Sequence, residues 1–491
     1  MTHPPKPARR GSKSMASKIL GSKILGGLDA AIDACGLRDG AVVSFHHHLR
    51  NGDGVLNAVM AAIARRGLKD VTVAASSLFA VHAPLVRHIE EGTVGGISAG
   101  FIAGPVAGAI SRGLLARPAR LLTHGGRARA IAAGELVIDA AFVAAPAADP
   151  LGNLNGVEGP SACGALGYPQ VDAAHARHVV AVTDHLVPYP ACPIAIGQEC
   201  VDFVVVLPSI GEAAGIVSGT TRPTGEPAGL AIAALAARVI EAAGLLADGF
   251  SFQTGAGGIS LAAAAAVRRR MRALGVVGSF ASGGITGQHV AMLEEGLFRT
   301  LLDVQCFDLE AVRSFARDPR HLAMSAARYA APGPRGAVVD ALDAVILGAT
   351  EIDRDFNVNV TTGSDGVLMG GSGGHADTAA GAGLAIVTSR LTAGGNPKLV
   401  ERVRTLTTPG ASVDVVVTEA GLAVNPARGA LRERLREAGL EVLGIDELLA
   451  RAAAAAERPA RPRGEGRTVA EVEYRDGAVI DTIPQVGREA G

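Results

Sequence analysis

Short runs of apolar residues recur along the chain and alternate with longer stretches that have the hydrophobic spacing of helices. The runs are about five residues long and rich in Val, Ile and Ala, which is typical of strands covered on both faces. They stand at 71–75, 141–145, 179–183, 203–207, 344–348, 385–389 and 415–419. Strands that alternate with helices predict open α/β sheets in which most strands are parallel.

The second half of the chain resembles the first. A strand after an Asp-Gly turn, a glycine-bearing loop and an apolar helix follow both Gly36 and Gly244. The triplet Glu-Glu-Gly occurs at 90–92 and again at 294–296, an offset of 204 residues. The same offset relates Asp139 to Asp343, Asp149 to Asp353, Asn153 to Asn357 and Asn155 to Asn359. A constant offset through several elements indicates an internal duplication.

We therefore predict two tandem open α/β domains, at 36–225 and 226–455. A partly disordered N-terminal arm (1–35) precedes them, and an extension (456–491) with a terminal hairpin that turns at Asp476-Gly477 follows. In open parallel sheets, ligands bind beyond the carboxyl ends of the strands. The matching loops of two duplicated domains can therefore face each other across a shared cleft.

Composition narrows the class of partners. Hydrophobic residues make up 48% of the chain but aromatic residues only 3%, so the cores must be built from aliphatic side chains. A net charge of −1 favours neither nucleic acid nor a membrane surface as a partner. The five Cys are scattered without a CxxC pair, which suits a reducing cytoplasm better than a disulfide scaffold or a zinc site. We see no apolar run long enough for a membrane span.

Two loops at matching positions carry candidate anion-binding groups. The first, SFHHHLRNGD (44–53), offers His46, His47, His48 and Arg50 to carboxylates. It can also be a plain turn with solvated imidazoles, and adjacent His side chains diverge too much to favour a metal. The second, QTGAGG (253–258), offers the backbone amides of Gly255, Gly257 and Gly258 to phosphate or carboxylate. Its spacing is not that of a dinucleotide-binding loop.

A glycine-rich segment, TGSDGVLMGGSGGHADTAAG (362–381), lies in the second half. Its GSDG part predicts a turn, and its GGSGGH part can direct several backbone N–H groups at one oxygen, the usual means of stabilising an acyl-transfer oxyanion. Glycine that serves a strained loop alone is the other interpretation. The function of two further residues is undecided at this stage. Cys163 lacks a supporting His and is more typical of an inert buried thiol than of a nucleophile. His124 in THGGRAR is either an anion contact or part of a surface turn.

Longer strings resemble a known family, the alpha chains of citrate lyase. The similarity runs from about residue 18 to the end. Its most specific strings are SFHHHLRNGD (44–53), HGGRARAI (124–131), GNLNGVEGPSACGALGY (152–168), GFSFQTGAGGISLA (249–262), ASGGITGQ (281–288), ATEIDRDFNVNV (349–360), GSDGVLMGGSGGHADTAAGA (363–382) and TPGASVDVVVTEAGLAVNPAR (408–428). The resemblance implies a CoA-transferase fold of two α/β domains, in agreement with the duplication.

The resemblance also implies an activity. Acetyl held as a thioester on an acyl carrier protein is exchanged for citrate, which releases acetate, and CoA thioesters are possible surrogates. The thiol belongs to a CoA-derived prosthetic group on the gamma chain, so no cofactor is expected to be bound covalently to this chain. A beta (lyase) chain would then cleave the citryl thioester. Further expectations are a homo-oligomer within the complex, a cytoplasmic location and no metal.

Many CoA-transferases use a Glu nucleophile, and the loop where it is expected reads ASGGITG here, without an acid. Citrate is itself a carboxylate, so it can attack the thioester directly and give a mixed anhydride. The alternatives are a covalent route through Glu351 and a non-catalytic module that senses an anion. The predicted catalytic groups are Gly371, Gly373, Gly374, His375 and Glu351; the predicted citrate ligands are His46–His48, Arg50 and Arg222; the predicted thioester or carrier contacts are Gly255, Gly257, Gly258, Ser364 and Asp365.

Overall fold

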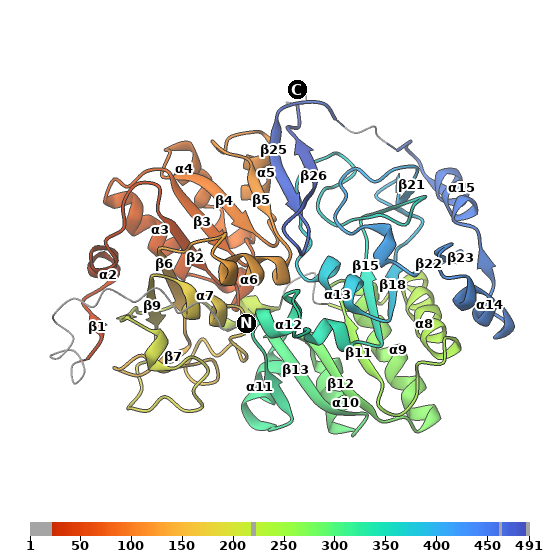
Figure 1. Cartoon of the computed structure of the whole chain (residues 1–491), viewed down its shortest axis with the longest axis horizontal. Coiled ribbons are helices and arrows are strands. Elements are labelled where there is room, and N and C mark those ends of the chain that lie inside the picture. Colours follow the sequence, from red (N-terminus) through yellow and green to blue (C-terminus); the bar gives the residue numbers. More distant parts are fainter. Residues whose placement is uncertain (1–21, 218–221, 461–463, 488–491) are drawn as a thin grey trace.

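Two large β-sheets, each covered by helices, form the molecule. The structure is a computed structural model that describes residues 22–217, 222–460 and 464–487. Figure 1 shows the first sheet in red to yellow, with two blue strands at one edge, and the second sheet in green to blue. The predicted fold class is confirmed, since nearly all neighbouring strands of both sheets run parallel.

The first sheet has ten strands in the order β1-β10-β9-β6-β2-β3-β4-β5-β25-β26. All pairs are parallel except β25 with β26. The strands are β1 (Ile24–Leu25), β2 (Val42–Phe45), β3 (Val71–Ala75), β4 (Val94–Ala99), β5 (Ala119–Leu121), β6 (Ala140–Ala144), β9 (His178–Thr183), β10 (Phe203–Val206), β25 (Thr468–Glu473) and β26 (Val479–Pro484). Its helices are α2 (Leu28–Cys35), α3 (Val55–Arg65), α4 (Leu85–Glu90), α5 (Pro105–Ser111), α6 (His124–Ala133) and α7 (Pro169–His175).

The second sheet has nine strands in the order β14-β13-β12-β11-β15-β18-β22-β23-β24, with only β22 and β23 antiparallel. The strands are β11 (Ser251–Thr254), β12 (Gly278–Ile285), β13 (Phe298–Cys306), β14 (His321–Ala323), β15 (Ala344–Gly348), β18 (Leu384–Thr388), β22 (Val415–Thr418), β23 (Gly421–Val424) and β24 (Val442–Leu443). Its helices are α8 (Pro227–Ala242), α9 (Gly258–Leu274), α10 (Gly287–Glu294), α11 (Leu309–Arg317), α12 (Ala326–Ala330), α13 (His375–Gly381), α14 (Gly429–Glu437) and α15 (Ile445–Ala455).

The central strands of the two sheets follow the same order, which confirms the duplication. The series β10-β9-β6-β2-β3-β4-β5 in the first sheet corresponds to β22-β18-β15-β11-β12-β13-β14 in the second. Small hairpin-like pairs follow at matching places, β7 (Ala147–Ala148) with β8 (Leu154–Asn155) and β16 (Glu351–Asp353) with β17 (Val358–Asn359).

The matched acids and amides have matched structural roles. The Asp149 carboxylate accepts the backbone N–H of Asn153, and the Asp353 carboxylate accepts that of Asn357. The side-chain oxygen of Asn359 accepts the backbone N–H groups of Thr361 and Thr362. The side-chain oxygen of Asn155 accepts those of Val157 and Glu158 in the same way. These repeated residues therefore hold the loops beyond β6 and β15 in shape, a structural role rather than a chemical one.

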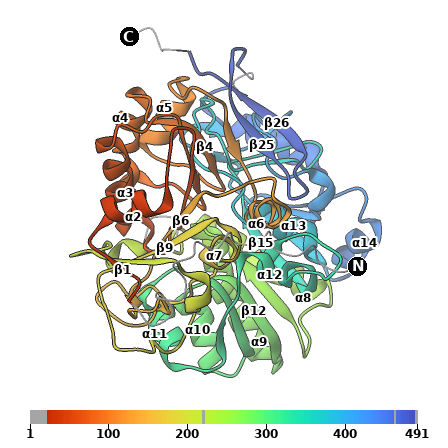
Figure 2. The same cartoon turned by 60° about the vertical axis from the view of Figure 1, so that its left-hand side comes forward.

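Both ends of the described chain add to the first sheet. Ile24–Cys35, within the predicted arm, form the edge strand β1 and the helix α2, while residues 1–21 lie outside the described part. The predicted hairpin is present, since β25 pairs with β26 in the antiparallel sense and the turn between them contains Gly477 at a φ of 95°. The strand β25 also pairs with β5 and so joins the hairpin to the first sheet. Figures 1 and 2 place it beside the second half. The exact domain boundaries remain a prediction.

The strands are buried because their side chains are aliphatic and pack between helices. Val43, Val73 and Phe142 of the first sheet, and Phe252 and Ile386 of the second, belong to one hydrophobic cluster with no more than 2% exposure. No helix in the described part of the chain is long and apolar enough to cross a membrane.

Candidate active site

The loop after β2 carries the three consecutive His and Arg50, and the structure buries all four. Arg50 is 5% exposed and has a positive φ of 52°, which is uncommon for a residue other than glycine. Its guanidinium carbon lies 4.8 Å from the ring centre of Phe79 and 5.0 Å from that of Phe307. Phe307 follows β13, so the second half contributes one of the two rings that flank this cation.

Imidazole and phenol rings gather beside this loop. The ring of Tyr168, the residue before α7, lies 5.0 Å from that of His47 and 5.7 Å from that of His48. His124, the first residue of α6, lies 4.6 Å from Tyr168 and 6.1 Å from His47, measured between ring centres. The four rings form one cluster that three loops of the first half supply, and we call it the ring cluster.

Side chains of the second half close the site from the other side. The side-chain amide of Gln305, on β13, donates to the backbone carbonyl of His47 over 2.8 Å. On β11, the Gln253 amide donates to the Tyr329 hydroxyl over 2.8 Å. Tyr329 belongs to α12, and a methyl group placed on Gly374 would come within 2.4 Å of its hydroxyl oxygen. The site therefore lies between the two halves, as expected for loops of duplicated domains that face each other.

The glycine-rich loop lies against the first half of the chain. The N–H of Gly373 donates to the carbonyl of Gly100 over 2.9 Å, and the N–H of His124 donates to the carbonyl of Gly373 over 2.8 Å. The Gly373 amide is thus already occupied and cannot serve as the predicted oxyanion donor. Among the described residues, the N–H groups of Gly371 and Gly374 have no backbone partner. Of these two, Gly374 lies beside Tyr329.

Burial sets the protonation of the ring cluster. It lowers the pKa of His48 and of His124 to about 3 and that of His47 well below its usual value, so all three are neutral at pH 7. Burial also lowers the pKa of Arg50, to about 10, which leaves the guanidinium charged. It raises the pKa of Tyr329 above its usual value, so the phenol keeps its proton.

Several buried polar atoms at the site have no hydrogen-bond partner within the described ranges. They are both ring nitrogens of His46, both of His48, Nδ1 of His124 and Oε1 of Gln305. Buried polar atoms are almost always paired in folded proteins. So many orphan groups next to a buried cation indicate that a polar, negatively charged ligand completes the site.

Two side chains predicted to be catalytic, those of His375 and Glu351, are hydrogen-bonded to neighbouring protein groups. Both ring nitrogens of His375 are hydrogen-bonded, Nδ1 to the Thr408 hydroxyl and Nε2 to the Gly348 carbonyl, and burial lowers its pKa to about 4. The Glu351 carboxylate accepts the side-chain amide of Asn359 and the backbone N–H of Arg404. These contacts favour a supporting role for both side chains.

The remaining predicted contacts lie towards the surface of the second half. Arg222 is exposed, and its backbone carbonyl lies beside Gly258. The Gly255 N–H donates to the carbonyl of Ile346 in the middle of β15, Gly257 has a φ of 134° and Gly258 begins α9. Ser364 and Asp365 line a separate pocket, described below.

Four residues of the site were not singled out from the sequence: Tyr168, Gln253, Gln305 and Tyr329. Gln253 stood within the quoted QTGAGG loop, and its place at the carboxyl end of a strand was a usable signal. Tyr168 precedes α7 and Tyr329 lies near the end of α12, and only the packing of α6, α7 and α12 against one another brings the two phenols into the site.

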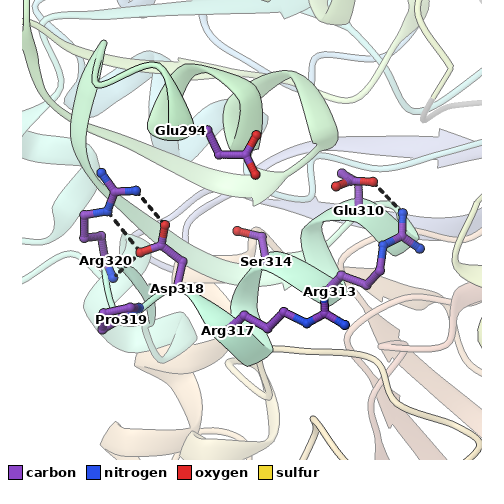
Figure 3. Close-up of a pocket in the computed structure, with 8 residues that line it drawn as sticks. All are labelled: Glu294, Glu310, Arg313, Ser314, Arg317, Asp318, Pro319 and Arg320. Atoms are coloured by element: carbon purple, nitrogen blue, oxygen red, sulfur yellow. Dashed lines mark hydrogen bonds and ion pairs between the residues drawn. The ribbon is translucent and has the colours of Figure 1, made fainter.

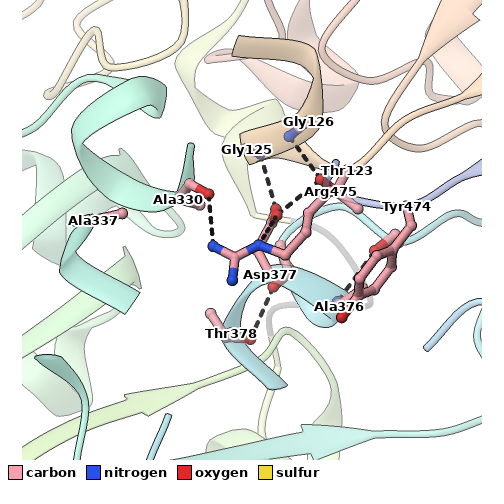
Figure 4. Close-up of polar contacts among 12 residues, drawn as sticks. Thr123, Gly125, Gly126, Ala330, Ala337, Ala376, Asp377, Thr378, Tyr474 and Arg475 are labelled. Atoms are coloured by element: carbon pink, nitrogen blue, oxygen red, sulfur yellow. Dashed lines mark hydrogen bonds and ion pairs between the residues drawn. The ribbon is translucent and has the colours of Figure 1, made fainter. Parts of the chain in front are cut away.

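Asp377 connects the two halves behind the ring cluster. Its carboxylate accepts the Thr123 hydroxyl over 2.8 Å and the Gly125 N–H over 2.9 Å, at the start of α6. Arg475, from the turn between β25 and β26, brings its Nε within 3.7 Å of the same carboxylate and donates to the Ala330 carbonyl (Figure 4). The carboxylate thus fixes the helix end that carries His124.

Replacing Asp377 with Asn should change how stability depends on pH. Burial raises the pKa of Asp377 to about 6, from 3.8. The folded chain therefore binds more protons than the unfolded chain between these values, and this carboxyl lowers the free energy of unfolding as the pH rises through that window. Denaturant unfolding should show the variant gaining about 3 kcal/mol relative to the native chain between about pH 4 and pH 7.

An Asp340→Asn variant is the matched control. Asp340 is exposed and lies 3.7 Å from the same guanidinium of Arg475. Its stability difference from the native chain should change with pH much less than that of Asp377→Asn, because burial of Asp377, and not the Asp340 charge, is the largest cause of the raised pKa. A difference for Asp377→Asn that changes no more with pH than that of the control would contradict the raised pKa.

Two further groups of reactive side chains lie in the core. Cys163 is 1% exposed and burial raises its pKa, as expected for an inert thiol. Within the described residues, the atoms of Asp303, Cys306 and His321 that can bind a metal lie within 4.8 Å of one another. Both the thiol and the imidazole Nε2 already bond to the Asp303 carboxylate, over 3.0 and 3.1 Å. Hydrogen bonding alone accounts for this cluster.

The repeated α/β halves and the site between them define a CoA-transferase-like protein. Among solved structures, a malonate decarboxylase hetero-tetramer from Pseudomonas has a chain with the same fold, with a TM-score of 0.67 at 18% identity over 92% of this chain and 97% of that one. An alpha subunit of citrate lyase from Streptococcus mutans, crystallised in complex with citrate, is far more similar. It gives a TM-score of 0.93 at 46% identity over 96% of this chain and 92% of that one.

Sequence comparison narrows the class further. The family model for the citrate lyase alpha subunit matches residues 21–486. The citrate lyase alpha chain of Escherichia coli is 49% identical over 96% of this chain and 92% of its own length, and that of Klebsiella pneumoniae is 48% identical over 94% and 91%. The chain belongs to the citrate lyase alpha subunit family. The family predicted from the sequence motifs is confirmed, and with it an enzyme of the transferase class.

Proposed function

We propose that this chain exchanges acetyl for citrate on the thioester of a CoA-derived group that the acyl carrier (gamma) subunit presents. The reaction converts acetyl-carrier and citrate into citryl-carrier and acetate. The observation that carries the proposal is the buried Arg50 beside the neutral imidazoles of His46 and His48, whose ring nitrogens are unpaired within the described part of the chain. The loop with Gly373 and Gly374 joins this group to Tyr329, since Gly373 lies against His124 and Gly374 against the Tyr329 hydroxyl. A tricarboxylate fits the first group, and a thioester carbonyl fits the second.

Arg50 and the His46–His48 loop are the proposed citrate ligands. A guanidinium binds a carboxylate through two parallel hydrogen bonds, and a neutral imidazole can donate one more. The rings of Phe79 and Phe307 hold the guanidinium in place before the ligand arrives. Because the imidazoles are neutral, each can also take up a proton when a trianion binds beside it.

The proposed transfer needs no covalent bond to the protein. A carboxylate oxygen of citrate attacks the acetyl carbonyl, the C–S bond breaks, and a mixed acetyl–citryl anhydride and the carrier thiolate form. The thiolate then attacks the citryl carbonyl of the anhydride, and acetate leaves with the bridging oxygen. The site contributes orientation and stabilisation of the charge that develops on each carbonyl oxygen.

Tyr329 and Gly374 are the proposed donors to that oxygen. The Tyr329 hydroxyl accepts a hydrogen bond from Gln253, so its own proton remains available for donation. A raised pKa keeps this proton on the phenol at neutral pH. The Gly374 N–H has no backbone partner among the described residues and lies next to the same hydroxyl. Two convergent donors are the usual means of stabilising an oxyanion.

Glu351→Gln should retain most of the transferase activity, within about threefold of the native chain. The side chain holds Asn359 and the Arg404 N–H, and an amide oxygen can still accept. The measurement is acetate release from acetyl-carrier and citrate, together with hydroxylamine treatment after acetyl-thioester alone. Peptide mass spectrometry that finds a hydroxamate at Glu351 in the native chain would establish the covalent route and overturn direct attack.

The other expectations about the complex are part of the same proposal. We propose that the chain works in the cytoplasm with a beta chain that cleaves the citryl thioester, and as a homo-oligomer. Exchange of labelled acetate into acetyl-carrier separates an enzyme from a sensor. The purified chain should catalyse this exchange only when citrate is present, and its failure to do so would favour the anion-sensing alternative.

A further inference from the structure

A second pocket, of about 550 Å³, opens beside the site at the carboxyl end of β15. Three segments line it: Ala349 and Thr350 after β15, the turn around Ser364 and Asp365, and the segment 396–398 with Asn396 and Lys398. Arg458, just after α15, completes the rim. Ligands of open α/β sheets bind at such strand ends.

The cationic groups of this pocket have no protein partner among the described residues. Lys398 is partly buried, desolvation lowers the pKa of its ammonium, and no carboxylate or carbonyl bonds to it. The Arg458 guanidinium likewise has no partner in the described part of the chain. The Ser364 hydroxyl is shielded from solvent and unpaired there. A partly desolvated cation and an unpaired hydroxyl in the same pocket can together bind an anion.

Two acidic side chains lie near these cations. Asp365 lines the pocket, but its carboxylate already accepts the Val367 N–H in the turn. The charge of Glu351 raises the pKa of Lys398 against the larger lowering by burial, while the Glu351 carboxylate itself bonds to Asn359 and to the Arg404 backbone. Both acids are therefore engaged elsewhere, and the two cations remain available to a ligand.

Another pocket of the molecule is different. It lies between α10 and α11 (Figure 3). There Arg320 pairs with Asp318 over 2.7 Å, and Arg313 pairs with Glu310. Three arginines and three acids line it, so its charges balance, whereas Lys398 and Arg458 of the pocket at β15 face only one lining acid, Asp365.

Two of the segments that line the pocket at β15 continue along the chain to the reaction site. Met369, which is 50% exposed on the rim, is followed directly by Gly370, whose carbonyl accepts the Ile102 N–H, and then by the loop that ends at Gly374. On the other wall, Ala349 follows Gly348, whose carbonyl accepts His375. A long ligand anchored in the pocket can therefore extend its far end along these segments towards Tyr329.

We propose that this pocket is a phosphate subsite, in which Lys398, Arg458 and Ser364 hold the phosphodiester or pyrophosphate of the CoA-type arm while its thioester reaches Gly374. The inference rests on the proposed function, since it places the other end of the same ligand. A compact ammonium suits phosphate as a point charge, and Met369 offers an apolar surface to the alkyl part of the arm. Carrier-bound arm and free CoA share this chemistry.

Lys398→Gln and Arg458→Gln test the subsite by comparing thioesters with and without phosphate. For acetyl-CoA and acetyl-carrier, each variant should raise the KM about tenfold while kcat changes little. For acetyl-pantetheine, which has no phosphate, KM and kcat should both stay near the native values. Lys69→Gln, at an exposed Lys of the first half, is the matched control and should behave as the native chain.

Every outcome bears on the subsite. An equal loss with acetyl-pantetheine would overturn it and assign Lys398 to the reaction centre. A loss with acetyl-CoA alone would restrict the subsite to the nucleotide end of free CoA, and a loss with both thioesters supports the shared arm. If the native chain has no transferase activity, the proposed function fails, but calorimetry still tests the subsite. Phosphopantetheine should bind about tenfold more tightly than pantetheine, and Lys398→Gln should abolish the difference.

Discussion

Replacing Arg50 with Gln is expected to raise the KM for citrate by about 100-fold or more, with a smaller effect on the KM for the acetyl thioester. A buried guanidinium that binds a carboxylate supplies two charge-assisted hydrogen bonds, each worth about 1.5–3 kcal/mol. A neutral amide can replace at most one of them, without the charge. Initial rates over a range of citrate concentrations measure the effect.

Two further variants make this result specific. Arg50→Lys keeps the charge but loses the planar fork and the stacking on Phe79 and Phe307, so it should recover only part of the affinity. Arg436→Gln, at an exposed helix position, should leave both KM values unchanged. Unchanged citrate saturation in a folded Arg50→Gln chain would show that the tricarboxylate binds elsewhere.

Gly374→Ala is expected to reduce kcat about 100-fold while the chain remains folded. The added methyl group would lie 2.4 Å from the Tyr329 hydroxyl, so the phenol must move away from Gln253 and from the carbonyl oxygen it is proposed to bind. Loss of one oxyanion donor typically costs a factor of about 100–1,000 in kcat. Single-turnover acetate release measures the chemical step directly.

Gly429→Ala is the matched control for this change. Gly429 begins α14, and a methyl group there would meet nothing within 4 Å. Its kcat and unfolding midpoint should equal those of the native chain. Tyr329→Phe removes the proposed donor without adding bulk and should also reduce kcat. A Gly374→Ala chain that turns over normally, or that only loses stability, would contradict the oxyanion role.

The sequence predicted the fold well because the fold repeats a strong local pattern. The runs at 71–75 and 344–348 are β3 and β15 to the residue, and the offset of 204 correctly matched β6 with β15. The edges of the first sheet were harder to predict. The strand β1 has only two residues, and β25 pairs with β5 across more than 300 positions, a contact that no local pattern encodes.

The candidate site was only partly predictable from the chain. The His46–Arg50 loop and the glycine-rich loop carry unusual local composition, and the structure brings both to the seam between the halves. Local composition cannot tell which amide is already occupied, and so Gly373 was grouped with Gly374. A role for Tyr329 in the site could not be predicted, because this residue belongs to a short, Ala-rich helix without a recognisable motif. Only its contact with Gln253 in the folded chain shows that it belongs to the site.

The central claim is that a citrate carboxylate attacks the acetyl thioester directly, and single-turnover transfer from citrate labelled with ¹⁸O in its carboxylates tests it. The chain, in excess over acetyl-carrier, is mixed with labelled citrate, and the acetate is analysed by mass spectrometry. Direct attack predicts that the first acetate carries one ¹⁸O, because the bridging oxygen of the mixed anhydride leaves with it. Unlabelled acetate in the first turnover would mean that a protein carboxylate supplied that oxygen, and would contradict the account.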